Sequence, residues 1–194
     1  MPDIKTANEL FLAKKFQEAC AIYDAILDEN PNDLSALNNK GYALSKLKDY
    51  AGALACYDLA LSISPNDKTL LTNKISALRK TKQYKDALQY CDQILDSHPD
   101  DNITLYHKER ILFSTGRYSE SVRCCNAILE SYSENEEVLF DKACALAKAG
   151  DDDEAIRILA KCASLSQSLK NKIRVHSAFS GISSSPRFQE IISE

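Results

Sequence analysis

The sequence predicts an all-α protein made of one helix pair that is repeated along the chain. Pro31, Pro65 and Pro99 stand 34 residues apart, each beside Asn or Asp. Ala, Leu, Lys, Asp and Glu dominate, and the 194 residues include only 5 Gly and 5 Pro, which favours helix over turn-rich β structure. Between the prolines, apolar and small residues recur with the period of a helix face.

The same spacing extends beyond the prolines. A small residue lies twelve positions before each proline, and steps of 34 continue this series to the end of the fifth frame: Ala19, Ala53, Ala87, Ser121 and Ala155. Five frames therefore follow one another without insertion. The expected repeats are residues 1–33, 34–67, 68–101, 102–135 and 136–169.

Each frame fits two helices, as the second frame illustrates. Leu37, Gly41 and Leu44 share one helix face, and a second helix carrying Tyr57 follows the break at residues 48–50. Pro65 should end this second helix, because proline lacks the N–H donor and disfavours helix in the residue before it.

The flanking positions complete the pattern. Asn66 or Asp67 is expected to cap the next helix. Small residues such as Ala53 should let the two helices of a pair approach closely, with an aromatic ring beside them. Since one pair cannot bury both of its apolar edges, successive pairs are expected to stack.

The second frame resembles the tetratricopeptide repeat (TPR). The residues that carry the resemblance are Leu37, Gly41, Leu44, Tyr50, Ala53, Tyr57, Ala60 and Pro65, with Leu37 in the place of the family's Trp. The likeness covers about residues 3–168. It implies a right-handed superhelical stack of antiparallel helix pairs, a TPR α-solenoid, formed by residues 1–194 as a single domain.

The pattern changes toward the C-terminus. Ser133 replaces the proline, Glu109 stands where Gly or Ala is usual, and Asp152 replaces the aromatic residue of the turn. Residues 170–194 are expected to cap the stack, since a terminal repeat needs a cover with a polar outer face.

Two helices are expected within this capping segment. One should cover residues 170–179, with Ile173 and Phe179 inward and either Val175 or His176 beside them. The other should begin at Pro186.

Composition and net charge exclude several classes of function. A net charge of −4 and a pI near 5.5 speak against nucleic acid as a partner. No apolar run reaches the length of a membrane span, and the N-terminal residues lack a secretory pattern, so we expect a cytoplasmic protein without a membrane partner. Seven Cys without a Cys-x-x-Cys pair indicate reduced, buried thiols. We expect no enzyme activity, no metal and no cofactor, because no catalytic or metal-ligating constellation is evident.

The resemblance implies a protein-interaction scaffold whose first helices line a concave groove. The free face of these helices offers amides suited to an extended peptide backbone, together with aromatic and basic side chains. A peptide segment or a helix of another protein is the expected ligand. The candidate groove residues are Asn8, Asn38, Asn39, Tyr42, Asn73, Arg79, Tyr106, His107, Arg110, Phe113 and Phe140.

Three alternatives remain. Some TPR proteins hold acidic chaperone tails with a clamp of Lys, Asn, Asn, Lys and Arg, and here only Asn8 and Asn39 fall on clamp positions, while Ile4, Thr69 and Asn73 occupy the basic ones. A carboxylate needs charged donors, so we expect no tight binding of such tails. Self-association into a homodimer is the second alternative. Binding of single-stranded RNA is the third alternative, and the net negative charge of the chain argues against it.

Overall fold

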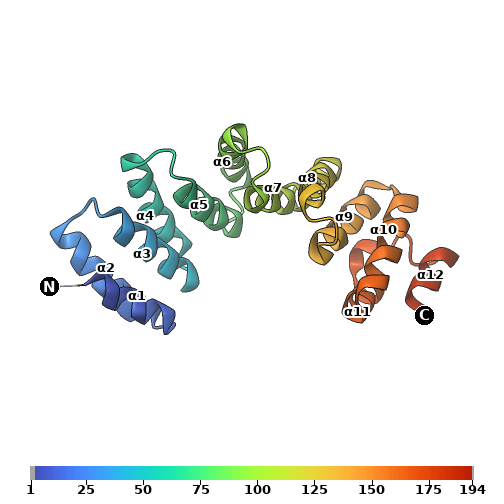
Figure 1. The fold of residues 1–194 in the computed structure, drawn as a ribbon, viewed down its shortest axis with the longest axis horizontal. Coiled ribbons are helices and arrows are strands. Elements are labelled where there is room, and N and C mark those ends of the chain that lie inside the picture. Colours follow the sequence, from blue (N-terminus) through green and yellow to red (C-terminus); the bar gives the residue numbers. More distant parts are fainter. Residues whose placement is uncertain (1–2, 194) are drawn as a thin grey trace. The chain divides into compact units, whose positions relative to one another are not determined.

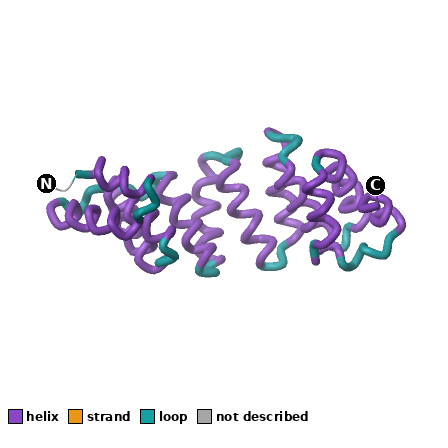
Figure 2. The backbone as a smooth tube through the Cα atoms, turned by 90° about the horizontal axis from the view of Figure 1, so that it is seen from below, coloured by secondary structure: helices purple, strands orange, loops and turns teal. Residues whose placement is uncertain are grey.

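The computed structural model of the protein describes residues 3–193 and contains only helices and connecting loops within them (Figures 1 and 2). The chain divides into two compact units, residues 1–97 and 98–194. In both units, helices that follow each other in sequence pack side by side as antiparallel pairs. The predicted all-α class of stacked helix pairs is confirmed, whereas the single domain over 1–194 stays a prediction.

Unit 1 contains the first three helix pairs. Its helices are α1 (Ile4–Leu12), α2 (Phe16–Glu29), α3 (Leu34–Lys46), α4 (Tyr50–Ile63), α5 (Lys68–Lys80) and α6 (Tyr84–Ser97). The first helices of successive pairs, α1, α3 and α5, also contact one another. They therefore form one layer of the unit.

Unit 2 contains two further pairs and the C-terminal segment. Its elements are α7 (Asn102–Ser114), α8 (Tyr118–Ser131), α9 (Glu136–Ala149), α10 (Asp152–Leu165), α11 (Gln167–Val175), the short 3₁₀ helix η1 (Ser177–Phe179) and α12 (Pro186–Ser193). The α11 helix packs on α10, η1 packs on α9, and α12 contacts both α10 and α11. The C-terminal segment thus covers the last helix pair.

Helix ends recur with the period of the repeat. The α4 helix ends at Ile63, two residues before Pro65, and Asp67 caps α5 by accepting hydrogen bonds from the backbone N–H groups of Thr69 at 2.8 Å and Leu70 at 3.1 Å. Equivalent caps, one repeat apart, are Asp33, Asp101 and Asn135. The predicted ends around Pro65 are confirmed.

The turn inside each pair uses one left-handed residue. Lys14, Lys48 and Lys82 have φ of 60°, 66° and 61°, whereas Gly116 and Gly150 hold the same position in unit 2 with φ of 77° and 83°. An L-residue pays a steric penalty there that glycine avoids. Unit 1 therefore keeps a lysine at three successive strained positions.

Close approach of the two helices in a pair depends on small residues. A Cβ atom at Gly41 of α3 would lie 2.6 Å from Cε1 and 2.9 Å from Cζ of Tyr57 on α4. The Tyr57 ring is completely buried, and burial raises the pKa of its hydroxyl to about 12. Glycine is thus required at position 41 by the ring that fills the space beside it.

The pairs of unit 1 are joined by repeated ion pairs. Lys40 of α3 contacts the carboxylate of Asp24 on α2, and Lys74 of α5 contacts Asp58 of α4 at 2.5 Å. The Lys74 ammonium also donates to the Tyr90 hydroxyl at 2.6 Å. Each lysine stem is largely buried while its charge reaches a carboxylate, so these contacts fix the register between pairs.

The fourth repeat replaces two small residues by a polar pair. Glu109 of α7 is only 2% exposed, and its Oε1 accepts a hydrogen bond of 2.9 Å from the Ser121 hydroxyl on α8. Ser121 occupies the position of the alanines in the other repeats. The unusual glutamate is therefore accommodated by a compensating change on the facing helix.

The capping segment differs in part from the expectation. One helix over residues 170–179 is wrong, because α11 ends at Val175 and His176 adopts an extended conformation before η1. Ile173 and Phe179 face inward as predicted, but Val175 is 81% exposed. The second helix begins at Pro186, as predicted.

No helix within residues 3–193 is both long enough and apolar enough to cross a membrane. All seven cysteines are free and buried.

Candidate functional site

Four asparagines on the first helices of unit 1 form a hydrogen-bonded ladder. The Asn8 Oδ1 accepts from the Tyr23 hydroxyl at 2.6 Å and from the Asn39 amide nitrogen at 3.0 Å. The amide of Asn38 donates to the Asn39 Oδ1 at 3.1 Å, and the amide of Asn73 donates to the Asn38 Oδ1 at 2.8 Å. The Asn ladder (Asn8, Asn38, Asn39, Asn73) therefore runs across α1, α3 and α5.

The Asn ladder keeps hydrogen-bonding capacity for a ligand. An asparagine amide nitrogen carries two N–H donors, and Asn38, Asn39 and Asn73 each use one of them within the ladder. All four side chains are half-buried, so they retain access to solvent. Because each hydrogen bond of the Asn ladder fixes the orientation of the neighbouring side chain, the remaining donors are held in place before a ligand arrives.

An aromatic pocket adjoins one end of the Asn ladder. Phe11 of α1 and Tyr42 of α3 stack with 5.3 Å between ring centroids, and the Lys46 ammonium lies 4.8 Å from the Tyr42 ring centre. Together with Leu12, Tyr23 and two ladder amides, these rings line a pocket of about 200 Å³. Leu12 is 79% exposed and Tyr42 41% exposed. Large exposed apolar groups beside fixed polar donors are typical of a binding surface.

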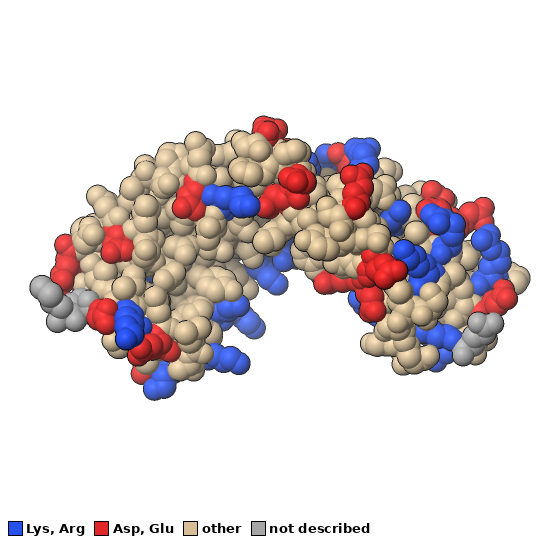
Figure 3. All heavy atoms as spheres, viewed as in Figure 1, with Lys and Arg blue, Asp and Glu red and all other residues tan. Residues whose placement is uncertain are grey.

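Basic residues gather where the first helices of unit 1 end. Figure 3 shows Lys and Arg side chains standing out along the lower edge of this unit. Lys46 and Lys80 are the last residues of α3 and α5, and both are exposed. Arg79 is half-buried, and its Nε atom has no hydrogen-bond partner among residues 3–193. Cations at helix C-termini are also favoured by the helix dipole.

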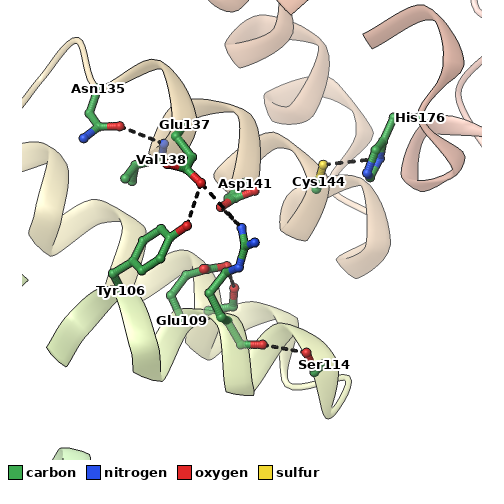
Figure 4. A network of polar contacts seen from close by, with 11 residues as sticks. Tyr106, Glu109, Ser114, Asn135, Glu137, Val138, Asp141, Cys144 and His176 are labelled. Atoms are coloured by element: carbon green, nitrogen blue, oxygen red, sulfur yellow. Dashed lines mark hydrogen bonds and ion pairs between the residues drawn. The ribbon is translucent and has the colours of Figure 1, made fainter. Parts of the chain in front are cut away.

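In unit 2, the predicted Tyr and Arg are engaged with acidic residues of the next helix pair (Figure 4). The Tyr106 hydroxyl donates to Glu137 at 2.6 Å, and Arg110 forms an ion pair with Asp141 at 2.8 Å. Burial and the bond to Glu137 raise the pKa of Tyr106 to about 12. Burial raises the pKa of Asp141, with Arg110 opposing that shift. These two side chains connect α7 to α9 and are less free to bind a ligand than the residues of the Asn ladder.

The other three predicted residues of unit 2 differ in exposure. His107 and Phe113 are half-buried, and Phe113 packs edge-on against Tyr118 at 5.4 Å. Phe140 is only 1% exposed, because η1 packs on α9 and places Phe179 and His176 against its ring at 5.7 and 5.2 Å. Phe140 is therefore a core residue, and we correct its placement in the groove.

A cysteine and a histidine meet in unit 2 without the features of a catalytic pair. The Cys144 Sγ lies 3.6 Å from the His176 Nδ1, which also accepts a hydrogen bond from the Ala178 backbone (Figure 4). Burial raises the pKa of Cys144 to about 12 and lowers the pKa of His176. A nucleophilic cysteine needs the opposite shift. Within the part of the chain that the structure describes, no group of His, Cys, Asp and Glu is arranged to hold a metal ion.

The sequence predicts the asparagines of the Asn ladder but not the neighbouring side chains that hold them in place. The hydroxyl of Tyr23, which the free helix face does not include, holds the Asn8 side chain in place. Phe11 and Leu12 also lie outside the predicted groove residues, although they line the aromatic pocket. Their position at the end of α1 beside exposed Tyr42 follows from the contact between α1 and α3, which no signal within one repeat reveals.

Helix pairs with a period of 34 residues, capped by Asp or Asn, are the arrangement of tetratricopeptide repeats. The tetratricopeptide repeat family model matches residues 35–67 and, separately, residues 136–169. Two segments of the chain thus match the tetratricopeptide repeat. A comparison with curated proteins found no match.

Several solved structures share the fold. A TPR protein from Parabacteroides merdae is 18% identical with a TM-score of 0.84, over 97% of this chain and 75% of that one. MamA from Desulfovibrio magneticus is 21% identical with a TM-score of 0.79, over 84% and 93%. YrrB, described as a TPR protein with an unusual peptide-binding site, is 20% identical with a TM-score of 0.73, over 86% and 87%. At these identities the likeness concerns the fold.

Proposed function

We propose that this protein is a non-catalytic interaction scaffold and that unit 1 binds an extended segment of a partner protein. The backbone of the segment lies along the Asn ladder, and one apolar side chain enters the aromatic pocket. The observation that carries the proposal is the continuity of the two features, since Asn8 and Asn39 belong to both.

The size and chemistry of the site favour a peptide over a small molecule. The aromatic pocket, at about 200 Å³, is smaller than the usual site for a drug-sized ligand, and it suits one side chain. The spare amide N–H donors match the carbonyl groups of an extended backbone. The likeness to YrrB adds support, because that protein has a peptide-binding site on the same fold.

Selection from a peptide library tests the proposal. Peptides selected on the wild-type protein are measured by calorimetry against a variant with Asn39→Ala and Tyr42→Ala. Losing a hydrogen bond and a ring contact together should weaken binding at least about tenfold. A matched control is Leu59→Ala, which removes a 44% exposed residue of α4 outside the site. Equal affinities of wild type and the double variant would rule out this site.

A second candidate function is self-association, and one feature of unit 2 favours it. Ile103 and Tyr132 are 62% and 58% exposed and line a pocket of about 350 Å³ with Val138. Light scattering should then show a dimer that Ile103→Ser with Tyr132→Ser converts to a monomer. A monomeric mass for the wild type at all concentrations would exclude this candidate.

A further inference from the structure

A pocket in unit 2 lies where α7 begins and α8 ends, and no residue of the Asn ladder lines it. Its volume is about 350 Å³. Ile128 and Val138, which are 3% and 4% exposed, are the buried part of its lining, and the exposed Ile103 and Tyr132 are the open part. This volume is at the lower end for ligand pockets, so it suits one large apolar side chain.

Two amides in this pocket are available to a peptide backbone. Asn102 is the first residue of α7, and its Oδ1 atom is buried without a hydrogen bond from any residue that the structure describes. A buried acceptor normally has a donor, so the site favours an N–H group from outside the chain. Asn135 accepts from the Val138 backbone N–H at 3.1 Å, which leaves the N–H donors of its own amide for a carbonyl group. The pocket can therefore pair with both polar groups of a peptide unit.

The segment that contributes Tyr132 and Asn135 to the pocket is acidic. Its exposed carboxylates, called the acidic rim, belong to Glu130, Glu134, Glu136 and Glu137. Glu137 accepts from the Tyr106 hydroxyl, as Figure 4 shows. The other three glutamates form no ion pair with any residue from 3 to 193.

Nearby cations do not neutralise the acidic rim. Lys161 donates to the Ser133 backbone carbonyl at 3.1 Å. Arg110 lies 4.0 Å from Glu137 but pairs more closely with Asp141, at 2.8 Å. The pocket lined by α10, α11 and α12 is different, because its two arginines hold carboxylates of α10. The pocket at the start of α7 thus combines apolar walls with negative charge that the chain leaves unpaired.

We propose that this pocket binds a basic segment of another protein, in which one large apolar side chain is flanked by arginines. The apolar side chain enters between Ile103 and Tyr132, and a backbone N–H of the segment donates to the Asn102 Oδ1 atom. The flanking cations pair with Glu134 and Glu136. Arginine suits these positions because its planar guanidinium group pairs with carboxylates and stacks on aromatic rings such as that of Tyr132.

The acidic rim favours this partner over a second copy of the chain, which the second candidate function places at the same pocket. In a two-fold dimer the same surface lies on both sides of the contact, so the glutamates of one copy would face those of the other. Like charges that meet across an interface oppose association. A basic segment meets no such repulsion.

Chemical-shift titration of the full-length protein with the blocked peptide Gly-Arg-Leu-Arg-Gly tests the proposal. This probe peptide should shift amides at the start of α7, the end of α8 and the start of α9 in a saturable way. Peptides with Ser in place of Leu, or with Glu in place of both Arg, should bind at least about tenfold more weakly. Raising the salt concentration from about 50 mM to about 500 mM should weaken binding at least about threefold, because exposed charges are screened.

Variants of the protein separate the contacts. Glu134→Gln with Glu136→Gln should weaken binding of the probe peptide at least about fivefold. The matched control is Asp28→Asn with Glu29→Gln, an equal loss of charge at the exposed end of α2, which should leave the affinity unchanged. Asn102→Ala should weaken binding about threefold without lowering the unfolding midpoint, because its Oδ1 atom has no partner within the described chain.

Any of three results would overturn the proposal. The first is the absence of saturable binding of the probe peptide. The second is equal binding of the probe peptide and either control peptide. The third is a dimer in light scattering that Ile103→Ser with Tyr132→Ser converts to a monomer while the probe peptide fails to bind, since a second copy would then occupy the pocket. Asn39→Ala with Tyr42→Ala should leave binding of the probe peptide unchanged, so a failure here is distinguishable from a failure of the site on unit 1.

Discussion

Replacing Gly41 by alanine sets two effects of known size against each other. Alanine in a helix interior is favoured over glycine by about 1 kcal/mol. The added Cβ, however, would lie 2.6 Å from Cε1 of the buried Tyr57 ring, where carbon atoms normally stay about 3.5–4.0 Å apart. Overpacking of this kind costs about 1–3 kcal/mol. We therefore expect Gly41→Ala to lower the free energy of unfolding by about 1 kcal/mol.

Urea denaturation followed by circular dichroism measures this change. With a slope of about 2 kcal/mol per molar urea, the midpoint should fall by about 0.5 M. Hydrogen exchange should show the loss of protection in α3 and α4. The control is Ala55→Gly, the reverse exchange at an exposed position of α4, which reports the helix-propensity term alone.

The Tyr57→Leu variant separates the steric contact with the ring from the effect of helix propensity. In a Tyr57→Leu protein the ring is absent, so Gly41→Ala should there become stabilising by up to about 1 kcal/mol. A double-mutant cycle should therefore show strong coupling between positions 41 and 57. If Gly41→Ala stabilises the wild-type protein by as much as Ala55→Gly destabilises it, the reasoning about the ring is wrong.

Three further predictions follow from single residues. Gly116→Ala should lower the free energy of unfolding of unit 2 by about 1 kcal/mol in urea denaturation, because φ at this position is +77°. Lys48→Gly, at a position with φ of +66°, should be neutral or stabilising. Equal losses of unfolding free energy in both variants would contradict this reasoning. Ser121→Ala should cost about 1.5–3 kcal/mol in urea denaturation, because it removes a hydrogen bond to the buried Glu109 carboxylate. The cost should be much smaller in a Glu109→Ala background, and equal costs in the two backgrounds would show that the pair is not coupled. Burial, with a smaller contribution from a nearby lysine, lowers the pKa of His176 below its ordinary 6.5, so the unfolded chain binds the proton more readily and the free energy of unfolding falls as the pH drops below 6.5. His176→Asn, which can keep the cap on η1, should reduce this pH dependence in denaturation curves measured between pH 7 and 5. An unchanged pH dependence would be the contrary result.

The repeat made most of the fold predictable from the sequence. Each proline, cap and small residue recurs every 34 positions, so one frame with clear features, such as that of Gly41 and Pro65, defines the others. The capping segment has no second copy for comparison. Its helix was predicted to continue through His176, where the chain is instead extended.

The candidate site was predictable only where it depends on one helix. Asn8, Asn39 and Asn73 follow from the free face of a helix, but their mutual hydrogen bonds depend on the distance between neighbouring helices. Phe140 was misplaced because its burial is caused by η1, a segment beyond the repeat. The pocket lined by α10, α11 and α12 requires three helices to meet, which no local pattern encodes.

The central claim is that unit 1 recognises a partner segment through the Asn ladder and the aromatic pocket. Amide chemical-shift mapping of the wild-type protein with a library-selected peptide tests it most directly. The account predicts the largest shifts on α1, α3 and α5, including the side-chain amides of Asn38, Asn39 and Asn73. Shifts confined to α2, α4 and α6, or to unit 2, would contradict it.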